Sequence, residues 1–211
     1  VNHEFNEKSS INFTAYMSRD RFNLNTDTFF HYKNQNIALK WKYNFNPRFN
    51  TGFSVGYDRY EYNITSDKNP INAYELRFDI AQAYLRNHYS YMINNKHTLD
   101  FGLNATYHKL HSGNYYPLGS QSLVEPVAMP AKQAAETALY ISDIYKITQN
   151  LTIDGGFRYV LYSYLGPGTV NQYPAGVPLR EDNITGTVLY TANKIINTYQ
   201  GPEIRVGFRQ M

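Results

Sequence analysis

The sequence predicts an all-β protein, an antiparallel transmembrane β-barrel. The hairpin between Glu136 and Gly168 shows the pattern on which this prediction depends. On its second arm apolar and polar side chains alternate over roughly fourteen residues, about twice the length of an ordinary strand. A tilted strand needs only about 9–11 residues to cross a bilayer. Strands of this length therefore predict a wall that crosses a membrane.

The composition supports the same fold. The chain has 16% aromatic residues, only 18% charged residues, and a mean hydropathy of −0.55, whereas a soluble domain carries about 25% charge. A membrane barrel has such a composition because its polar lumen face offsets its apolar lipid face. No apolar run reaches the ~18 residues of a membrane helix, so any crossing is by strands.

Charge and cysteine content exclude several classes of function. The formal net charge is +3 and the basic residues are scattered, which gives no support to a nucleic-acid partner. The absence of cysteine removes disulfides, thiolate metal sites and cysteine nucleophiles.

The alternation predicts about eight strands that follow one another as a meander. Their expected ranges are Ser9–Phe22, His31–Phe45, Asn50–Asn63, Ala73–Met92, His97–Leu110, the two arms of Glu136–Gly168, and Pro202–Gln210. In the strand that starts at Ala73, the apolar positions change phase after Gln82. This change predicts a β-bulge.

Connection lengths predict the orientation of the barrel. Tight joins at Phe45–Asn50, Ile93–Lys96 and Thr148–Asn150 alternate with longer ones, of which His111–Lys132 and Gly166–Tyr199 are very long. In outer-membrane barrels the turns are periplasmic and the loops extracellular. Aromatic residues near the tight ends fit an interfacial girdle; they are Trp41, Tyr43, Phe45, Tyr91 and Tyr145. The main alternative, a soluble barrel of the lipocalin kind, would have shorter strands and an outer face richer in Lys and Glu.

Three motifs carry a resemblance to a known family. They are E-x-A-L-Y-I-S-D-x-Y-K-I-T from Glu136, G-F-R-Y followed by Y-L-G-P-G up to Gly168, and Y-x-G-P-E-x-R from Tyr199 to Arg205. Together they resemble the barrel of TonB-dependent outer-membrane receptors of the Bacteroidota type. The motifs mark barrel construction and do not identify a ligand.

The resemblance implies a barrel of 22 strands with an N-terminal plug. It also implies import of a large or scarce nutrient with energy relayed by TonB, no cofactor and no enzyme activity. With about eight predicted strands and no plug-like segment, we expect residues 1–211 to form a single β-barrel segment, an internal part of a larger receptor in the bacterial outer membrane. The expected partners are outer-membrane lipid, the TonB system through parts outside this chain, and a surface lipoprotein or other outer-membrane subunits.

Charged residues in the strands are the first candidate site. The charges predicted to face the lumen are Lys40, Lys42, Asp58, Arg77, Asp79, Asp100 and Arg158. Both signs occur, which argues against a ring selective for one kind of ion. We favour a hydrated, salt-bridged wall that packs against a plug over a substrate path.

Long connections are the second candidate, because binding function concentrates in loops. The expected ligand-binding residues are Tyr115, Tyr116, Tyr173, Arg180, Glu181 and Asp182. Such side chains stack on or hydrogen-bond a sugar- or peptide-like ligand. The alternative is that these loops only cover the barrel or contact a partner lipoprotein.

Catalysis and metal binding have weaker support. Polar groups of the outer rim that could gather as a catalytic set are Asp20, Asp58, Glu61, His111 and Ser112, but nothing in the sequence fixes their geometry. His108 and His111 are three apart, and in a strand such residues face opposite sides. We expect His108 in the lumen, His111 in a loop, and no metal site.

The sequence therefore favours the wall of an active nutrient receptor. Two alternatives remain open: a structural or assembly subunit of a larger outer-membrane complex, and a complete eight-stranded barrel that acts as an anchor or binder.

Overall fold

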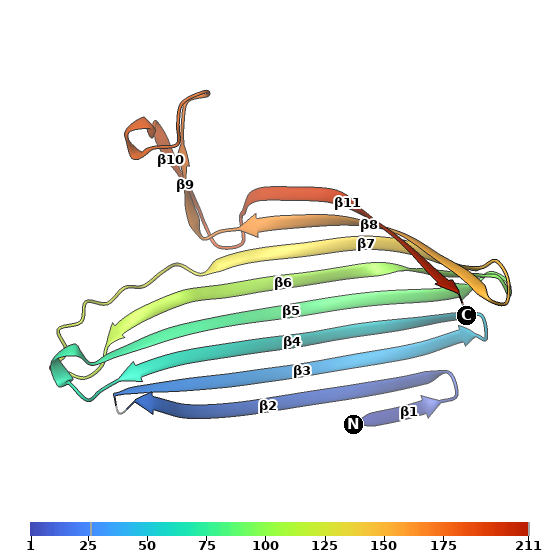
Figure 1. Cartoon of the computed structure of the whole chain (residues 1–211), viewed down its shortest axis with the longest axis horizontal. Coiled ribbons are helices and arrows are strands. Elements are labelled where there is room, and N and C mark those ends of the chain that lie inside the picture. The colour runs from blue at the N-terminus through green and yellow to red at the C-terminus, as the bar shows by residue number, and fades with distance from the viewer. Residues whose placement is uncertain (26, 211) are drawn as a thin grey trace.

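The computed structural model describes residues 1–25 and 27–210, which fold mainly into strands (Figure 1). The strands are β1 (Asn2–Asn6), β2 (Ser9–Asn25), β3 (Thr28–Asn46), β4 (Phe49–Ser66), β5 (Tyr74–Met92), β6 (His97–Pro117), β7 (Lys132–Lys146), β8 (Leu151–Leu165), β9 (Gly168–Gln172), β10 (Gly186–Tyr190) and β11 (Ile195–Gln210). Two single-turn 3-10 helices lie at Pro70–Asn72 and Glu181–Asn183. Within the described residues no helix is both long and apolar enough to cross a membrane.

Nine of these strands form one antiparallel sheet in the order β1-β2-β3-β4-β5-β6-β7-β8-β11. The predicted meander is therefore confirmed. The sheet is open, with β1 and β11 at its two edges, so the closed eight-stranded barrel of the third hypothesis is not the arrangement seen. Strands β9 and β10 form a separate hairpin that projects from the sheet (Figure 1).

Several predicted boundaries are wrong. Strand β1 was not expected, and β6 continues to Pro117, which places His111 in a strand instead of a loop. The connection predicted from Gly166 to Tyr199 contains the β9–β10 hairpin and the start of β11 at Ile195. These segments are short or rich in polar residues, so their alternation is weak; their pairing with neighbouring strands makes them strands.

A short polar side chain closes each of four tight turns at one end of the sheet. Asn6, Asn46 and Asn94 accept hydrogen bonds through Oδ1 from the backbone N–H two residues later, at 2.9, 2.9 and 2.8 Å. Thr148 Oγ1 accepts from the backbone N–H groups of Asn150 and Leu151 at 3.2 and 3.0 Å. Because these side chains stabilise the turn locally, they fix where each strand reverses.

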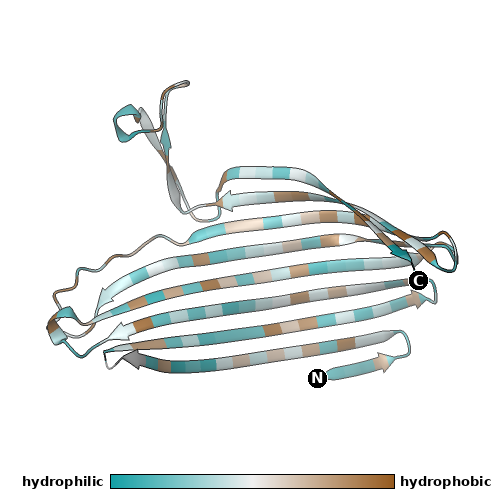
Figure 2. Cartoon of the chain, viewed as in Figure 1, coloured by the Kyte–Doolittle hydropathy of each residue, from teal (hydrophilic) through white to brown (hydrophobic). Residues whose placement is uncertain are grey.

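The strand register defines two faces of the sheet, since directly paired residues point to the same side. Phe13, Leu39, Val55, Leu85 and Ala105 form one continuous row. We call their side the outward face and the other the inward face. Figure 2 shows hydrophobic and hydrophilic residues alternating along the strands.

Large apolar side chains on the outward face are exposed. Met17, Leu139 and Ile204 expose 61, 62 and 79% of their surface. The other exposed members of this outward apolar band include Phe13, Ile37, Leu39, Trp41, Tyr57, Ile141, Phe157, Leu161, Val206 and Phe208. No large side chain among the described residues is fully buried. A single sheet with this surface requires an apolar environment outside, so the outward face is the lipid side.

The aromatic residues near the tight turns form the expected girdle. Tyr43 packs edge-to-face on Phe45 with ring centroids 5.0 Å apart, and Phe45 stacks on Phe49 at 4.8 Å. Phe49 continues the contact to Tyr91 at 5.7 Å. Trp41 lies 5.7 Å from Tyr43 at the same end. Amphipathic rings at this depth suit the periplasmic interface of a membrane.

The bulge predicted after Gln82 is wrong. Strand β5 pairs with β4 without interruption from Tyr74 to Tyr91. The only register shift along β5 in its described pairings lies between Arg77 and Asp79, opposite β6, where Gly113 adopts φ +117°. The apolar residues change phase because β5 changes environment: near the loops its apolar side chains face inward, and farther down they face outward.

Candidate functional site

The predicted lumen charges divide between the two faces. Lys40, Lys42, Asp58, Asp100 and Arg158 share the inward face, as the register of β3 to β8 requires.

Arg77 and Asp79 lie on the outward face, because they share the two-residue period of the outward residues Ala81, Ala83 and Leu85 in β5. Their assignment to the lumen is therefore wrong. The prediction requires the apolar side of β5 to face outward along its whole length, whereas that side turns inward near the loops.

Asp58 is held by two amide side chains on the inward face. Asn36 donates a hydrogen bond to Asp58 Oδ1, and Gln82 Nε2 donates to Oδ2 at 2.9 Å. These residues come from β3, β4 and β5. Each oxygen of the carboxylate thus has a neutral donor, which stabilises the charge without a cation.

Arg158 connects three strands of the inward face. Its Nη2 donates to Glu136 Oε1 at 2.8 Å, and its Nε lies 3.7 Å from Glu203 Oε2. Glu136 and Glu203 are not among the residues predicted from the sequence. The register would have identified Glu203, which pairs directly with Arg158. It would not have identified Glu136, which pairs with Tyr162 and is reached only by the long Arg158 side chain.

A second polar group surrounds Tyr140. Its hydroxyl lies 2.8 Å from His88 Nδ1, and His88 Nε2 lies 3.7 Å from Asp100 Oδ1. Gly102 permits this arrangement, because a Cβ there would lie 2.7 Å from the Tyr140 hydroxyl. His88, Asp100, Tyr140 and Arg158 border a shallow hollow of about 540 Å³, comparable in size to small-molecule pockets. The inward face is therefore a hydrated wall with paired charges.

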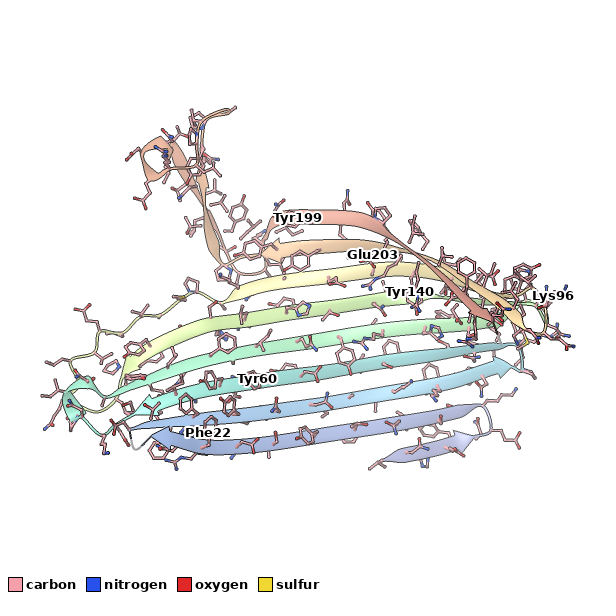
Figure 3. The ribbon with its side chains drawn as sticks, in the orientation of Figure 1. Phe22, Tyr60, Lys96, Tyr140, Tyr199 and Glu203 are labelled. Carbon is pink, nitrogen blue, oxygen red and sulfur yellow. The ribbon has the colours of Figure 1, made fainter. Side chains whose placement is uncertain are left out.

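Aromatic rings dominate the inward face near the loops. Phe22 stacks on Phe30 at 5.0 Å and on Tyr32 at 5.6 Å between ring centroids. Tyr32 stacks on Tyr62 at 4.9 Å and lies 6.4 Å from Tyr60. We call these five residues the inner aromatic cluster. Figure 3 shows Phe22 and Tyr60 toward the loop end of the sheet, away from Lys96 in the β5–β6 turn.

The inner aromatic cluster was missed because its members alternate with polar residues as lipid-facing residues do. Its rings are partly accessible, with 39% of Phe22 exposed. Partly exposed rings offer flat faces and, in the tyrosines, hydroxyl groups, both of which suit contact with ring-bearing ligands.

The predicted loop residues fall into two separate groups. Tyr115 and Tyr116 lie in β6 instead of a loop and point to opposite faces: Tyr115 contacts Tyr74 at 4.9 Å, and Tyr116 lies under the Arg77 guanidinium at 5.7 Å. Tyr173, Arg180, Glu181 and Asp182 lie in or beside the β9–β10 hairpin.

Figure 1 shows that the end of β6 and the β9–β10 hairpin are far apart. The structure does not bring the six residues into one site. Ligand binding by either group stays a prediction.

The disfavoured catalytic set does not gather. Asp20 and Asp58 lie on the inward face, whereas Glu61 and His111 lie on the outward face. His108 and His111 face opposite sides as predicted, and His111 Nδ1 lies 2.9 Å from Asp79. Within residues 1–25 and 27–210, no three His, Asp or Glu side chains are placed to hold a metal ion.

A protein-family model described as "TonB dependent receptor-like, beta-barrel" matches residues 2–192. The chain belongs to this family. Proteins of the family are transporters, not enzymes, and lie in the bacterial outer membrane. A barrel in that membrane faces lipid, so membership in the family also accounts for the lipid-facing band. The match does not distinguish the Bacteroidota type, which stays a prediction.

Solved structures agree on the fold. The copper transporter OprC matches with a TM-score of 0.71 and 12% identity over 98% of this chain and 32% of that one. BauA, the ferric preacinetobactin receptor from Acinetobacter baumannii, matches with a TM-score of 0.63 and 11% identity over 98% of this chain and 36% of that one. The chain thus spans about a third of the length of these receptors. None of the curated protein sequences matches.

Proposed function

We propose that residues 1–211 form one segment of the wall and outer loops of a receptor that imports a nutrient through the outer membrane with energy from the TonB system. The family match and the lipid-facing band support this proposal. The paired charges of the inward face, such as Arg158 with Glu136, suit a wall that packs against a plug.

The observation that carries the proposal is the position of the inner aromatic cluster. It lies on the lumen side, near the loops, where a ligand from outside would first meet the wall. Five rings from three adjacent strands present faces and hydroxyl groups there. We infer a ligand with a planar or apolar ring face, such as an aromatic compound or a sugar, which binds by stacking.

The β9–β10 hairpin has a supporting role in this proposal. It projects beyond the sheet and carries Tyr173, Arg180, Glu181 and Asp182 (Figure 1). Projecting loops of this kind bind ligands or contact partners. A surface lipoprotein or another outer-membrane subunit is a candidate partner for the hairpin.

The first experiment is growth of a deletion strain on a panel of limiting nutrients, including copper- and iron-limited media and media with sugars or peptides as the sole carbon source. We expect a defect on one of them. Co-purification with stable partners and no defect on any medium would support the assembly role instead.

A second experiment tests the inner aromatic cluster on the nutrient so identified. Removing two rings with Tyr32→Ala and Tyr62→Ala should raise the KM of uptake about fivefold or more, because each ring contact contributes about 0.5–1.5 kcal/mol. Tyr57→Ala is the matched control, since it removes an outward ring from the same strand as Tyr62. Equal KM values in the two variants would show that the cluster does not contact the ligand.

A further inference from the structure

A hollow on the inward face adjoins the inner aromatic cluster on the side away from the loops. It has a volume of about 390 Å³, which is in the range of small-molecule pockets. The inward side chains that border it come from β2 to β5 and include Tyr16, Asn34, Asn36, Asp58, Tyr60 and Gln82. Tyr60 (Figure 3) belongs both to the cluster and to the hollow. A ligand that stacks on the cluster can therefore place a substituent in the hollow.

The free polar atoms around Asp58 are hydrogen-bond acceptors. Asn36 and Gln82 each donate one hydrogen bond to its carboxylate. A carboxylate only accepts, so both amides must direct their NH2 groups toward it and their carbonyl oxygens elsewhere. Those two carbonyl oxygens accept no hydrogen bond from any described residue. The hollow therefore offers a negative charge and unused acceptors to a ligand.

Arg59 is the one cation among the described residues that border the hollow, and it does not neutralise Asp58. It follows Asp58 in β4 and therefore belongs to the outward face. Its guanidinium is paired on that face with Glu61 at 3.1 Å and with Asp79 at 3.5 Å. The charge of Arg59 is thus already engaged by two carboxylates on the other side of the sheet.

Positive charge on the inward face lies at a distance from Asp58. On the neighbouring strands the closest inward lysine and arginine are Lys40 and Arg86, which share the pairing row of Ser54. That row is four residues from Asp58 toward the tight turns, about 13 Å along the strand. From Asp58 to the loops, the described inward residues of β2 to β5 include a second carboxylate, Asp20, and no lysine or arginine. This sector of the lumen wall is therefore negatively charged and attracts cations.

Tyrosine rings border the hollow on two sides. Tyr60 is two residues from Asp58 on the same face of β4. Tyr16 pairs with Asn36 in the row of Asp58, and 59% of its surface is exposed. The face of such a ring attracts a cation. A neutral hydroxyl group would use the acceptors of the hollow but would leave the charge of Asp58 uncompensated, so the site favours a cationic group.

We propose that this hollow binds a protonated amine or guanidinium group of the imported ligand, with Asp58 as its counter-ion. Both groups carry only donors, which match the free acceptors of the hollow. Hydrogen bonds between such a cation and a carboxylate are stronger than neutral ones. The ligand is then a ring compound with a basic substituent: the ring stacks on the inner aromatic cluster and the cation enters the hollow. This inference rests on the proposed function, because it assigns a charge to the ligand of the same site.

The test uses the purified full-length receptor in detergent and three probes that share one phenol ring. Tyramine carries a protonated amine, 4-ethylphenol a neutral chain and 4-hydroxyphenylacetate a carboxylate. Saturation-transfer NMR titrations give the Kd of each probe. We expect tyramine to bind about tenfold more tightly than 4-ethylphenol, because a hydrogen bond to a charged group contributes more than a neutral one. The carboxylate probe should bind more weakly than either, and added salt should reduce the preference for tyramine.

Asp58→Asn removes the charge and keeps the size of the side chain. In this variant tyramine and 4-ethylphenol should bind with nearly equal Kd values. Asp154→Asn is the matched control, because Asp154 is a carboxylate of the same inward face at the opposite end of the sheet, in β8. The control should keep the preference for tyramine. Heat-modified migration on gels checks that both variants fold.

Two results would overturn the proposal and leave the ring-binding site in place: equal binding of tyramine and 4-ethylphenol by the unmodified receptor, or a preference for tyramine that persists in Asp58→Asn. Failure of the proposed function has a different signature. If no probe bound, or if Tyr32→Ala with Tyr62→Ala left the Kd of 4-ethylphenol unchanged, the inner aromatic cluster would not be a ligand site.

Discussion

Ala15 offers the sharpest test of which face of the sheet meets lipid. It lies on the outward face of β2, exposed, opposite Ile37, and midway between Ile11 and Arg19. At about 3.3 Å per residue and a tilt of about 40°, Ala15 lies roughly 10 Å from each edge of the apolar band. The whole band is then about 20 Å tall, close to the ~25 Å found in outer-membrane barrels.

Replacing Ala15 with Arg introduces a charge at this depth and removes almost no packing. An arginine at the midplane of a barrel costs about 2–4 kcal/mol. The side chain can reach part of the way to the headgroups, so we expect the lower half of this range. Ala15→Leu should leave stability unchanged or raise it, because it only adds apolar surface toward lipid.

Thr14→Arg is the matched control, since Thr14 is the adjacent exposed residue and faces inward. Because this side chain lies in the hydrated lumen, we expect Thr14→Arg to change the free energy of unfolding by less than about 0.5 kcal/mol. The measurement is guanidinium unfolding of the full-length protein in phosphatidylcholine vesicles. The assignment of the faces would be refuted if Thr14→Arg lowered the free energy of unfolding as much as Ala15→Arg does, or more.

Three further predictions concern the two faces. Gly102→Ala should lower the free energy of unfolding in the same denaturation assay by about 1–3 kcal/mol. The added Cβ would lie too close to the Tyr140 hydroxyl and to a facing backbone carbonyl. Gly52→Ala is the control and should leave the free energy of unfolding unchanged, because nothing lies within 4 Å of its added Cβ. Arg158→Met should lower the free energy of unfolding by about 0.5–1 kcal/mol at low salt and by less at high salt, because the carboxylate partners of Arg158 are partly exposed. A decrease in the free energy of unfolding that is independent of salt would contradict an electrostatic role. The fluorescence of Trp41 is obtained as the difference between the unmodified protein and Trp41→Phe. Lipids brominated near the headgroup should quench this fluorescence more than lipids brominated at the chain ends, because Trp41 lies in the girdle. Stronger quenching by the lipids brominated at the chain ends would show that Trp41 does not belong to the girdle.

The membrane-spanning part of the fold could be predicted from sequence because lipid and water impose opposite demands on adjacent residues. Within that part, Leu39 and Lys40 had to face opposite sides, and the side of Leu39 had to be outward. The turns were also local: Asn46, Asn94 and Thr148 stabilise them through their own side chains. The family motifs pointed to the same architecture that the family match supports.

Near the loops the sequence alone does not determine which face of each strand is inward. A period of two tells which residues of one strand share a face, but not which face is inside once the strand leaves the lipid. There Tyr60 and Tyr62 turn inward while Arg77 and Asp79 turn outward, the reverse of the arrangement in the membrane.

The sequence by itself determined long strands, tight turns at one end and an apolar lipid face, because these follow from residues close together in the chain. Only the tertiary structure decided how the strands align. That alignment assembles the inner aromatic cluster from β2, β3 and β4 and places Glu136 and Glu203 beside Arg158. Each of these groups consists of residues from strands separated by long stretches of chain, so cross-strand pairing, which sequence periodicity does not contain, creates them.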